Sequence, residues 1–339
     1  MDTFATAPMW AGFLVLVLGT LVVDVFVLGG RHAHRVSTRE ALGWTLAWST
    51  LAVLFGIALW WLLAGSAGRE TADRKVLEFY TGYLIELSLS VDNMFVFAMI
   101  FGYFAVPPEL QRRVLLFGVV GAIVMRAVMI LLGVWLISEF SWILYVFGVF
   151  LLFTGIKMLF VSRRAPDLSR NPIVRFLCAH MRITADYHGE HFFVRVDGLR
   201  HATPMFLVVL LVEATDLVFA VDSIPAIFAV TTDPFIVFTS NIFAIMGLRA
   251  LYFLLANLAQ HFHYLKYGLA IVLAFIGAKM LAEPWFHVPV HWSLGAVAMT
   301  LFVSVLVSRA RARRTLAHAG DELGGHCAPR ERRAGNRRT

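Results

Sequence analysis

Nine long apolar segments constrain the fold of this chain more than any single motif does. A helix needs about 20 apolar residues to cross a bilayer, so each segment is long enough for one transmembrane helix. The first follows Asp2 rather than a basic stretch and is too long for the apolar part of a signal peptide, so we count it as a helix. The segments predict an all-α fold, a polytopic membrane helix bundle. They lie near residues 9–29, 41–64, 79–104, 113–136, 142–162, 203–231, 235–257, 264–282 and 292–308.

The composition excludes most other classes of protein. Of the 339 residues, 59% are hydrophobic and 15% are charged, whereas soluble domains carry about 25% charged residues. The two cysteines, Cys178 and Cys327, imply no disulfide framework. In a membrane chain the net charge of +7 reports which loops stay in the cytoplasm rather than affinity for nucleic acid. We therefore expect the protein to have membrane lipids rather than nucleic acid as partners. We do not expect it to be a soluble enzyme.

The placement of lysine and arginine predicts the orientation of the bundle. With the N-terminus outside, the cytoplasmic segments hold 22 basic residues, and the external segments hold 3, namely Arg69, Arg74 and Lys75. Because basic residues concentrate in cytoplasmic loops, we expect an external N-terminus and a cytoplasmic C-terminus.

Two polar regions divide the chain. A membrane domain at 1–308 contains a cytoplasmic insertion at 163–202, and a basic tail follows at 309–339. Within the insertion, the stretch from Phe192 to His201 alternates apolar and polar residues around an Asp-Gly pair, which is typical of a β-hairpin. The tail has few apolar residues and is predicted to be disordered.

Two parts of the chain, about 79–162 and 203–282, resemble each other. Each predicts three helices, an odd number, so the second copy is upside down in the membrane relative to the first. Inverted repeats are typical of secondary transporters, whose site lies near the bilayer midplane between the copies. The alternative is an old duplication that now serves packing alone. The equivalent residues are Glu86 and Asp216, Asp92 and Asp222, Arg126 and Arg249, and the runs Gly155-x-Lys157-Met158-Leu159 and Gly277-x-Lys279-Met280-Leu281.

Charged residues inside the predicted spans point to a functional site. An ionisable side chain deep in a membrane helix costs at least about 2.5–3.5 kcal/mol to insert. Two arginines can neutralise only two of the six acids, and the acidic excess then needs protons or a bound cation. Asp24 is equally well explained as an interfacial acid, and Glu213 as a simple partner of an arginine. The charged residues are Asp24, Glu86, Asp92, Glu213, Asp216, Asp222, Arg126 and Arg249.

The donor atoms around these acids narrow the kind of cation. Carboxylates, the amides of Asn93 and Asn241 and the Ser223 hydroxyl are hard oxygen donors, which suit Mn²⁺, Ca²⁺ or Mg²⁺. No cysteine lies in a predicted span, which argues against Cu⁺ or a thiolate zinc site. Pro225 removes a helical hydrogen bond next to Asp222 and can open the turn that holds this carboxylate. The candidate metal ligands are Glu86, Asp92, Asn93, Glu213, Asp216 and Asp222, and the charge-balancing residues are Arg126 and Arg249.

Two stretches resemble the signature motifs of the TerC/Alx family of bacterial integral membrane proteins. They are Glu86-Leu-Ser-Leu-Ser-Val-Asp92-Asn93 and Glu213-Ala-Thr-Asp216-Leu-Val-Phe-Ala-Val-Asp222-Ser223-Ile-Pro225-Ala. The likeness covers about residues 10–310. It implies a multi-helix protein of the bacterial inner membrane linked to manganese efflux, with older associations to tellurite resistance and redox modulation. It also implies that the motif acids and Asn93 are metal ligands.

Together these features predict a transporter that exports a divalent cation, with Mn²⁺ as the first choice, by alternating access of the two repeats. Asp92 and Asp222 are the expected central ligands. We expect no cofactor and no enzymatic activity, because no nucleophile–base pair, cofactor motif or nucleotide-binding motif is present. Two alternatives stay open. One is a redox-modulating or oxyanion-resistance protein that binds a tellurite-like anion through Arg126 and Arg249, and the other is a membrane partner that supplies manganese to exported proteins.

Overall fold

The computed structural model of this chain describes residues 3–23, 37–140, 142–160, 176, 181–196, 198–256, 265–286 and 288–326. Asp24, most of the first half of the insertion and the last part of the tail lie outside the described residues. The backbone of Asp92 belongs to a helix, but its side chain is also outside the description.

Within the described residues, nine helices match the nine predicted segments one to one. Seven of them are long and apolar enough to cross a membrane, and α1 and α9 are shorter apolar helices. A two-stranded antiparallel hairpin, β1 (Phe193–Val196) and β2 (Leu199–Ala202), lies where the sequence predicts it. The polytopic helical fold is therefore confirmed. The helices are α1 (Ala7–Val23), α2 (Thr38–Ser66), α3 (Arg69–Tyr103), α4 (Pro108–Glu139), α5 (Ile143–Phe160), α7 (Pro204–Phe228), α8 (Pro234–Ala256), α9 (Leu265–Ala282) and α10 (Val290–His326).

Two boundaries differ from the predictions because helices continue beyond their apolar cores. Helix α3 begins at Arg69, so the charged stretch predicted as a loop is helical and carries the acidic Glu70 in its first turn. Helix α10 continues to His326, so residues 309–326 are helical rather than disordered. Both extensions contain residues such as Ala, Arg, Glu and Leu, which favour helix even outside an apolar environment.

Local signals explain where several helices begin. The side chain of Ser37 accepts a hydrogen bond from the backbone N–H of Glu40 and caps α2. Pro108 and Pro204 occupy the first turns of α4 and α7, where a missing N–H costs nothing. The turn between α2 and α3 uses Gly68 with a φ of 87°, a left-handed conformation that glycine adopts without strain.

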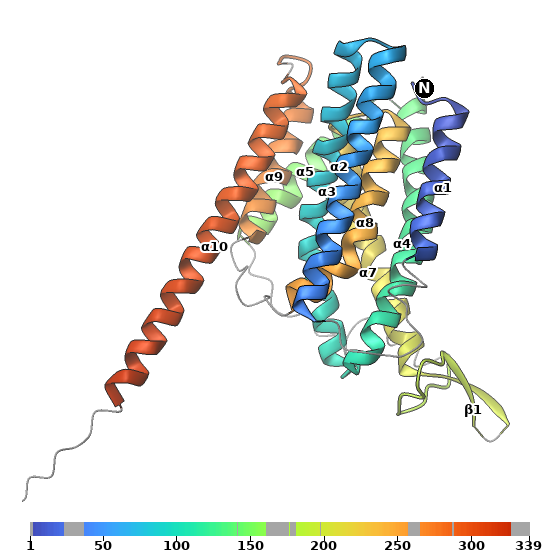
Figure 1. Ribbon diagram of the computed structural model, residues 1–339, viewed down its shortest axis with the longest axis vertical. Coiled ribbons are helices and arrows are strands. Elements are labelled where there is room, and N and C mark those ends of the chain that lie inside the picture. Colours follow the sequence, from blue (N-terminus) through green and yellow to red (C-terminus); the bar gives the residue numbers. More distant parts are fainter. Residues whose placement is uncertain are drawn as a thin grey trace, which may run out of the picture.

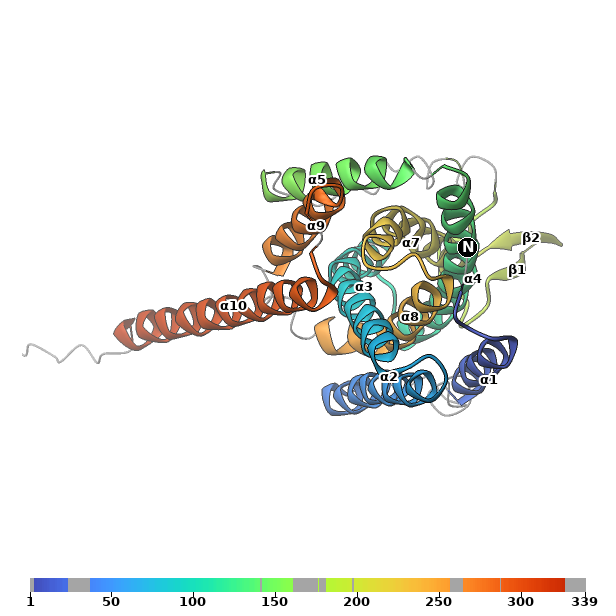
Figure 2. The same cartoon turned by 90° about the horizontal axis from the view of Figure 1, so that it is seen from above.

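The helices alternate in direction between two ends of the bundle (Figure 1). We call the end beside the chain's N-terminus the N-terminal end, and the opposite end, which carries β1 and β2, the hairpin end. Helices α3, α4 and α5 run opposite to α7, α8 and α9, respectively, as an inverted pair of three-helix units requires. Helix α8 lies inside the bundle (Figure 2). In its most apolar stretch 94% of the residues are buried, against 11% in that of α10.

The outer surface of the bundle is apolar. Val15, Trp61 and Phe160 are each at least 70% exposed, which lipid but not water explains. Exposed tryptophans lie at helix ends that face the N-terminal end, among them Trp142, on the residue before α5, and Trp292, in the first turn of α10. Tryptophan prefers the boundary between lipid and water, so these residues mark one membrane surface.

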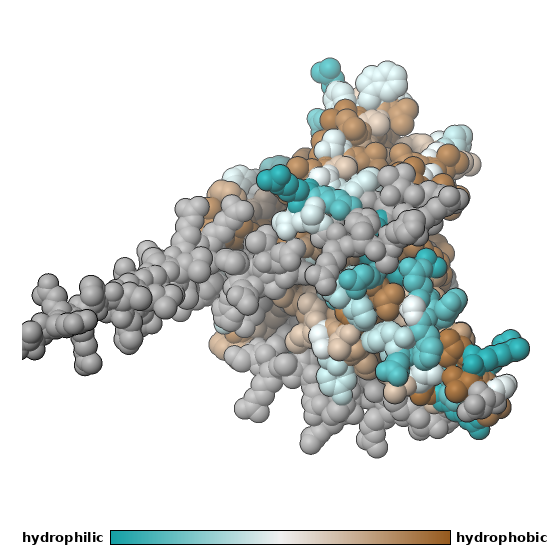
Figure 3. Space-filling model, turned by 60° about the horizontal axis from the view of Figure 1, so that its bottom comes forward, coloured by the Kyte–Doolittle hydropathy of each residue, from teal (hydrophilic) through white to brown (hydrophobic). Residues whose placement is uncertain are grey.

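The insertion docks against the hairpin end. Glu190 pairs with Arg113 of α4 at 2.8 Å, and the hydroxyl of Tyr187 donates to the backbone carbonyl of Phe104 at 2.8 Å. Burial raises the pKa of Tyr187 to about 12, so the phenol keeps the proton that it donates. Hydrophilic side chains gather over the hairpin and the helix ends beside it (Figure 3).

Candidate functional site

A fully buried arginine lies at the centre of the bundle. Arg126 of α4 is 0% exposed, and its Nη1 donates to the carboxylate of Glu86 on α3, to Ser223 Oγ at 2.9 Å and to Asn241 Oδ1 at 2.7 Å. Its Nη2 lies 3.6 Å from Asp216 Oδ1 on α7. One guanidinium therefore joins α3, α4, α7 and α8, since Ser223 is on α7 and Asn241 on α8.

The two acids on Arg126 are equivalent residues of the two repeats. Glu86 and Asp216 begin the matching motifs of the first and second copies, and both are almost completely buried. Their charges exceed that of the single arginine. One oxygen of each, Glu86 Oε2 and Asp216 Oδ2, is buried without a hydrogen-bond partner. Such oxygens are costly to bury, so the site is suited to receive a proton or a cation.

The carboxylate of Glu213 lies against α4, the helix that carries Arg126, but at a different position along it. A Cβ added at Gly121 of α4 would lie 2.1 Å from Glu213 Oε1, so the carboxylate fills the space that this glycine leaves. Gly121 is a site residue that sequence reasoning missed, because an apolar helix contains many glycines and only packing distinguishes this one.

Asn93 and Asp222 line a separate cavity rather than the Arg126 cluster. This cavity, of about 410 Å³, lies between α3, α5, α7 and α9, and we call it the Asp222 cavity. Thr154 and Lys157 of α5 contribute its other polar lining. The amide nitrogen of Asn93 is buried without a hydrogen-bond partner. Helix α7 continues through Pro225, so the turn at Asp222 is not opened as the sequence suggested.

Arg249 does not share the central site. It lies near the hairpin end of α8, where it lines a small pocket with Glu40 of α2 and Arg112 of α4. The structure therefore does not bring the second of the two equivalent arginines to Glu86 and Asp216, and a charge-balancing role of Arg249 stays a prediction. By the spacing that relates Arg126 to Arg249, Asn241 corresponds to Gly118, so the first repeat offers no matching amide to Arg249.

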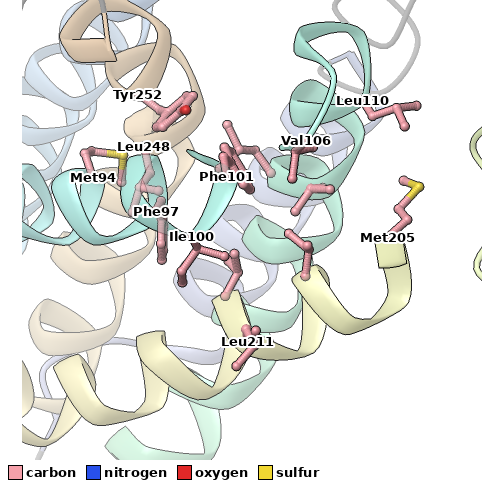
Figure 4. Packing of buried hydrophobic residues seen from close by; sticks show 14 of the residues in the cluster. Met94, Phe97, Ile100, Phe101, Val106, Leu110, Met205, Leu211, Leu248 and Tyr252 are labelled. Atoms are coloured by element: carbon pink, nitrogen blue, oxygen red, sulfur yellow. The ribbon is translucent and has the colours of Figure 1, made fainter. Parts of the chain in front are cut away.

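Apolar side chains close the site toward both ends. On the hairpin side, Phe97, Leu115 and Leu248 line a small void against Asp216 and belong to a large cluster of buried hydrophobic residues (Figure 4). On the N-terminal side, Ile130 and Ile224 belong to a second cluster between α4, α5, α7 and α8. The central acids are therefore occluded from both membrane surfaces.

The predicted ligands whose side chains the structure describes do not form one acidic group. Among the residues that the structure describes, no three His, Cys, Asp or Glu side chains are close enough to hold a metal ion together. Glu86 and Asp216 gather on Arg126, Asn93 and Asp222 line the Asp222 cavity, and Glu213 lies against Gly121. The side chain of Asp92, the sixth predicted ligand, lies outside the described residues, and only the position of its backbone on α3 is given.

Comparison with known proteins gives consistent matches. Residues 71–316 match the family model described as the integral membrane protein TerC family. Proteins named as membrane-bound redox modulators, Alx, from Salmonella typhi and Escherichia coli (strain K12) are each 54% identical over 308 residues, which cover 91% of this chain and 96% of each relative. An uncharacterized membrane protein of Myxococcus xanthus, STKORF319, is 44% identical over 316 residues, with 92% and 96% covered. No solved structure matches the chain.

Proposed function

The chain belongs to the integral membrane protein TerC family, and we propose that it exports a divalent cation, Mn²⁺ in the first place, across the bacterial inner membrane. The two inverted three-helix units alternate access to a site between them. A gradient of protons or other ions drives export.

The observation that carries this proposal is the shared arginine. Equivalent acids of the two inverted units, Glu86 and Asp216, contact the one guanidinium of Arg126 in a fully buried site. Inverted-repeat transporters hold their substrate where the copies meet. A buried excess of negative charge is stable only with a further positive charge, which a metal cation or a proton supplies.

The donor set supports a hard divalent cation. Asp222 and Asn93 offer oxygen atoms in a cavity large enough to admit a partly hydrated ion. Glu86 and Asp216 stay paired with Arg126 when no cation is present and take protons or the cation during the cycle. Asp92 and Glu213 complete the set of candidate ligands. Met158 also lines the Asp222 cavity, and a soft thioether donor at a site disfavours the harder Ca²⁺ and Mg²⁺ relative to Mn²⁺.

Transport by purified protein in liposomes tests the proposal. We expect flux of Mn²⁺ to exceed that of Ca²⁺, Mg²⁺ and tellurite, and to fall at least tenfold in Glu86→Gln and Asp222→Asn. Glu139→Gln is the matched control, because Glu139 is an exposed acid at the end of α4, away from the site. Proton movement in the opposite direction, followed with a pH dye, is expected to fall in step with Mn²⁺ flux in Asp222→Asn.

Two outcomes contradict the proposal. Absence of Mn²⁺ flux in folded wild-type protein excludes a transporter of this cation, and flux of tellurite alone favours oxyanion handling. Proton flux that persists unchanged in Asp222→Asn excludes coupling through this site.

A further inference from the structure

Helices α5 and α9 form one closely packed unit. A Cβ added at Gly155 of α5 would lie 2.6 Å from the backbone nitrogen of Ala274 on α9, and one added at Gly277 would lie 2.4 Å from that of Leu152 on α5. Gly155 and Gly277 are equivalent residues of the two repeats. The two backbones therefore touch at a crossing to which each repeat contributes its glycine, and the pair lies along one side of the bundle (Figure 2).

Two cavities lie between this pair and helices α3 and α7, a boundary that we call the seam. The Asp222 cavity is one of them. The other, the N-terminal cavity, has a volume of about 980 Å³ at the N-terminal end and is lined by residues such as Glu78, Tyr145, Thr232 and Lys279. The lining of both cavities includes residues of α3, α5, α7 and α9.

Between the cavities the seam is closed by packed apolar side chains. Ile85 of α3, Leu151 of α5, Ala226 of α7 and Ile276 of α9 are all buried in one hydrophobic cluster. Glu78 and Leu89, which line the two cavities from α3, are separated by about 16 Å along that helix at 1.5 Å per residue. The barrier between the cavities is therefore short compared with a bilayer core of about 30 Å.

The repeat relates the linings of the two cavities. Lys157 and Met158, near the end of α5, line the Asp222 cavity, and the equivalent Lys279 and Met280 of α9 line the N-terminal cavity. An inverted repeat places equivalent residues at opposite ends of one boundary when each of its halves forms one mouth of a pathway. If the duplication served packing alone, we would not expect a cavity beside both of these equivalent positions.

The helices on the other side of the seam are held together differently. Hydrogen bonds from Arg126 connect α3, α7 and α8 to α4 in the buried interior. Across the seam, the cluster around Leu151 consists of apolar side chains. Two apolar surfaces can slide past each other at a lower cost in free energy than two surfaces joined by a buried charge network, because no hydrogen bond has to break.

We propose that the transported cation crosses the protein along the seam, through the Asp222 cavity and the N-terminal cavity in turn, as the α5–α9 pair moves against the Arg126-linked helices. This inference rests on the proposed function and adds the route, the moving unit and the two mouths.

Single cysteines test the route. In a variant without native cysteines (Cys178→Ser with Cys327→Ser), Thr154→Cys places a thiol in the Asp222 cavity, and Thr232→Cys places one in the N-terminal cavity. Ile156→Cys is the control, because Ile156 is on the same helix as Thr154, is 44% exposed and lines neither cavity. Each protein is labelled with a small maleimide, the extent of labelling is measured by mass spectrometry, and Mn²⁺ flux is then measured in liposomes.

We expect complete labelling at either cavity position to reduce Mn²⁺ flux at least tenfold, and excess Mn²⁺ to slow labelling at both. Labelled Ile156→Cys should keep the flux of the cysteine-free protein. Full flux after complete labelling at both cavity positions overturns the route. Absence of flux in the unlabelled cysteine-free protein, if wild type also lacks it, instead overturns the proposed function, so the two failures are distinguishable.

Discussion

Arg126 determines how the interior of this protein can be stable. Its guanidinium pairs with two buried carboxylates at once, Glu86 and Asp216, and donates to two neutral acceptors, Ser223 and Asn241. Removing one partner of a buried ion pair leaves the other charge without compensation, which costs more than replacing the whole pair by apolar groups. We therefore expect Arg126 to contribute to the stability of the fold, apart from any part in the transport that we propose.

Replacement of Arg126 by methionine should destabilise the folded protein by about 3–5 kcal/mol. The reason is that Glu86 and Asp216 would remain buried without their counter-charge. Thermal unfolding in detergent, followed by size-exclusion chromatography of the soluble fraction, measures the loss.

The double variant Arg126→Met with Glu86→Gln is the companion measurement. It should recover part of the lost stability, because one of the two uncompensated charges is gone. A single variant Arg126→Met that unfolds at the wild-type temperature contradicts the role assigned to this residue.

At the scale of the elements, the α5–α9 crossing depends on two glycines. Any side chain at Gly155 or Gly277 meets backbone atoms, which cannot rotate away as a side chain would. Elsewhere in the chain, Gly295 of α10 has no atom within 4 Å of its added Cβ. Substitution of each of these three glycines by alanine therefore separates the effect of helix propensity on stability from the effect of helix packing.

Gly155→Ala and Gly277→Ala should each lower stability by about 1–3 kcal/mol, the usual cost of overpacking a tight site. Gly295→Ala should leave stability unchanged or raise it by up to about 1 kcal/mol, since alanine favours helix. Unfolding temperatures of the three purified proteins give the comparison. Equal shifts in all three would mean that the crossing is looser than described.

The elements were predictable from sequence to a greater extent than the site. Apolar length and the Asp-Gly turn suffice for nine helices and a hairpin, because both depend on local chemistry. The partner of a given side chain depends instead on helix rotation and depth. Arg249 was grouped with Arg126 by its repeat position, yet it lies with Glu40 and Arg112. Asn93 and Glu86 share a helix face in sequence, but only Glu86 reaches the arginine.

For the whole molecule, the basic residues of the hairpin end and the tryptophans of the N-terminal end are consistent with one membrane orientation. Arg112, Arg113, Arg195 and Arg200 all lie at the hairpin end. The external N-terminus stays a prediction from the distribution of charge.

Thiol labelling of intact cells tests this orientation. The native Cys178 and Cys327 both belong to segments predicted to be cytoplasmic, so a membrane-impermeant maleimide should label wild-type protein only after the cells are made permeable. In a variant without these cysteines, Thr3→Cys should react in intact cells. Labelling of the native cysteines from outside would reverse the predicted topology.

Helix α10 packs against both α3 and α9, and its C-terminal part projects away from the rest of the bundle (Figure 1). It therefore contacts both sides of the seam, and its projecting part is accessible to a binding protein. An antibody fragment bound to the projecting part would add a recognisable feature to a protein of only 37.9 kDa for electron cryomicroscopy. Because α10 contacts both sides of the seam, a bulky C-terminal fusion is a poor choice for measuring the transport that we propose.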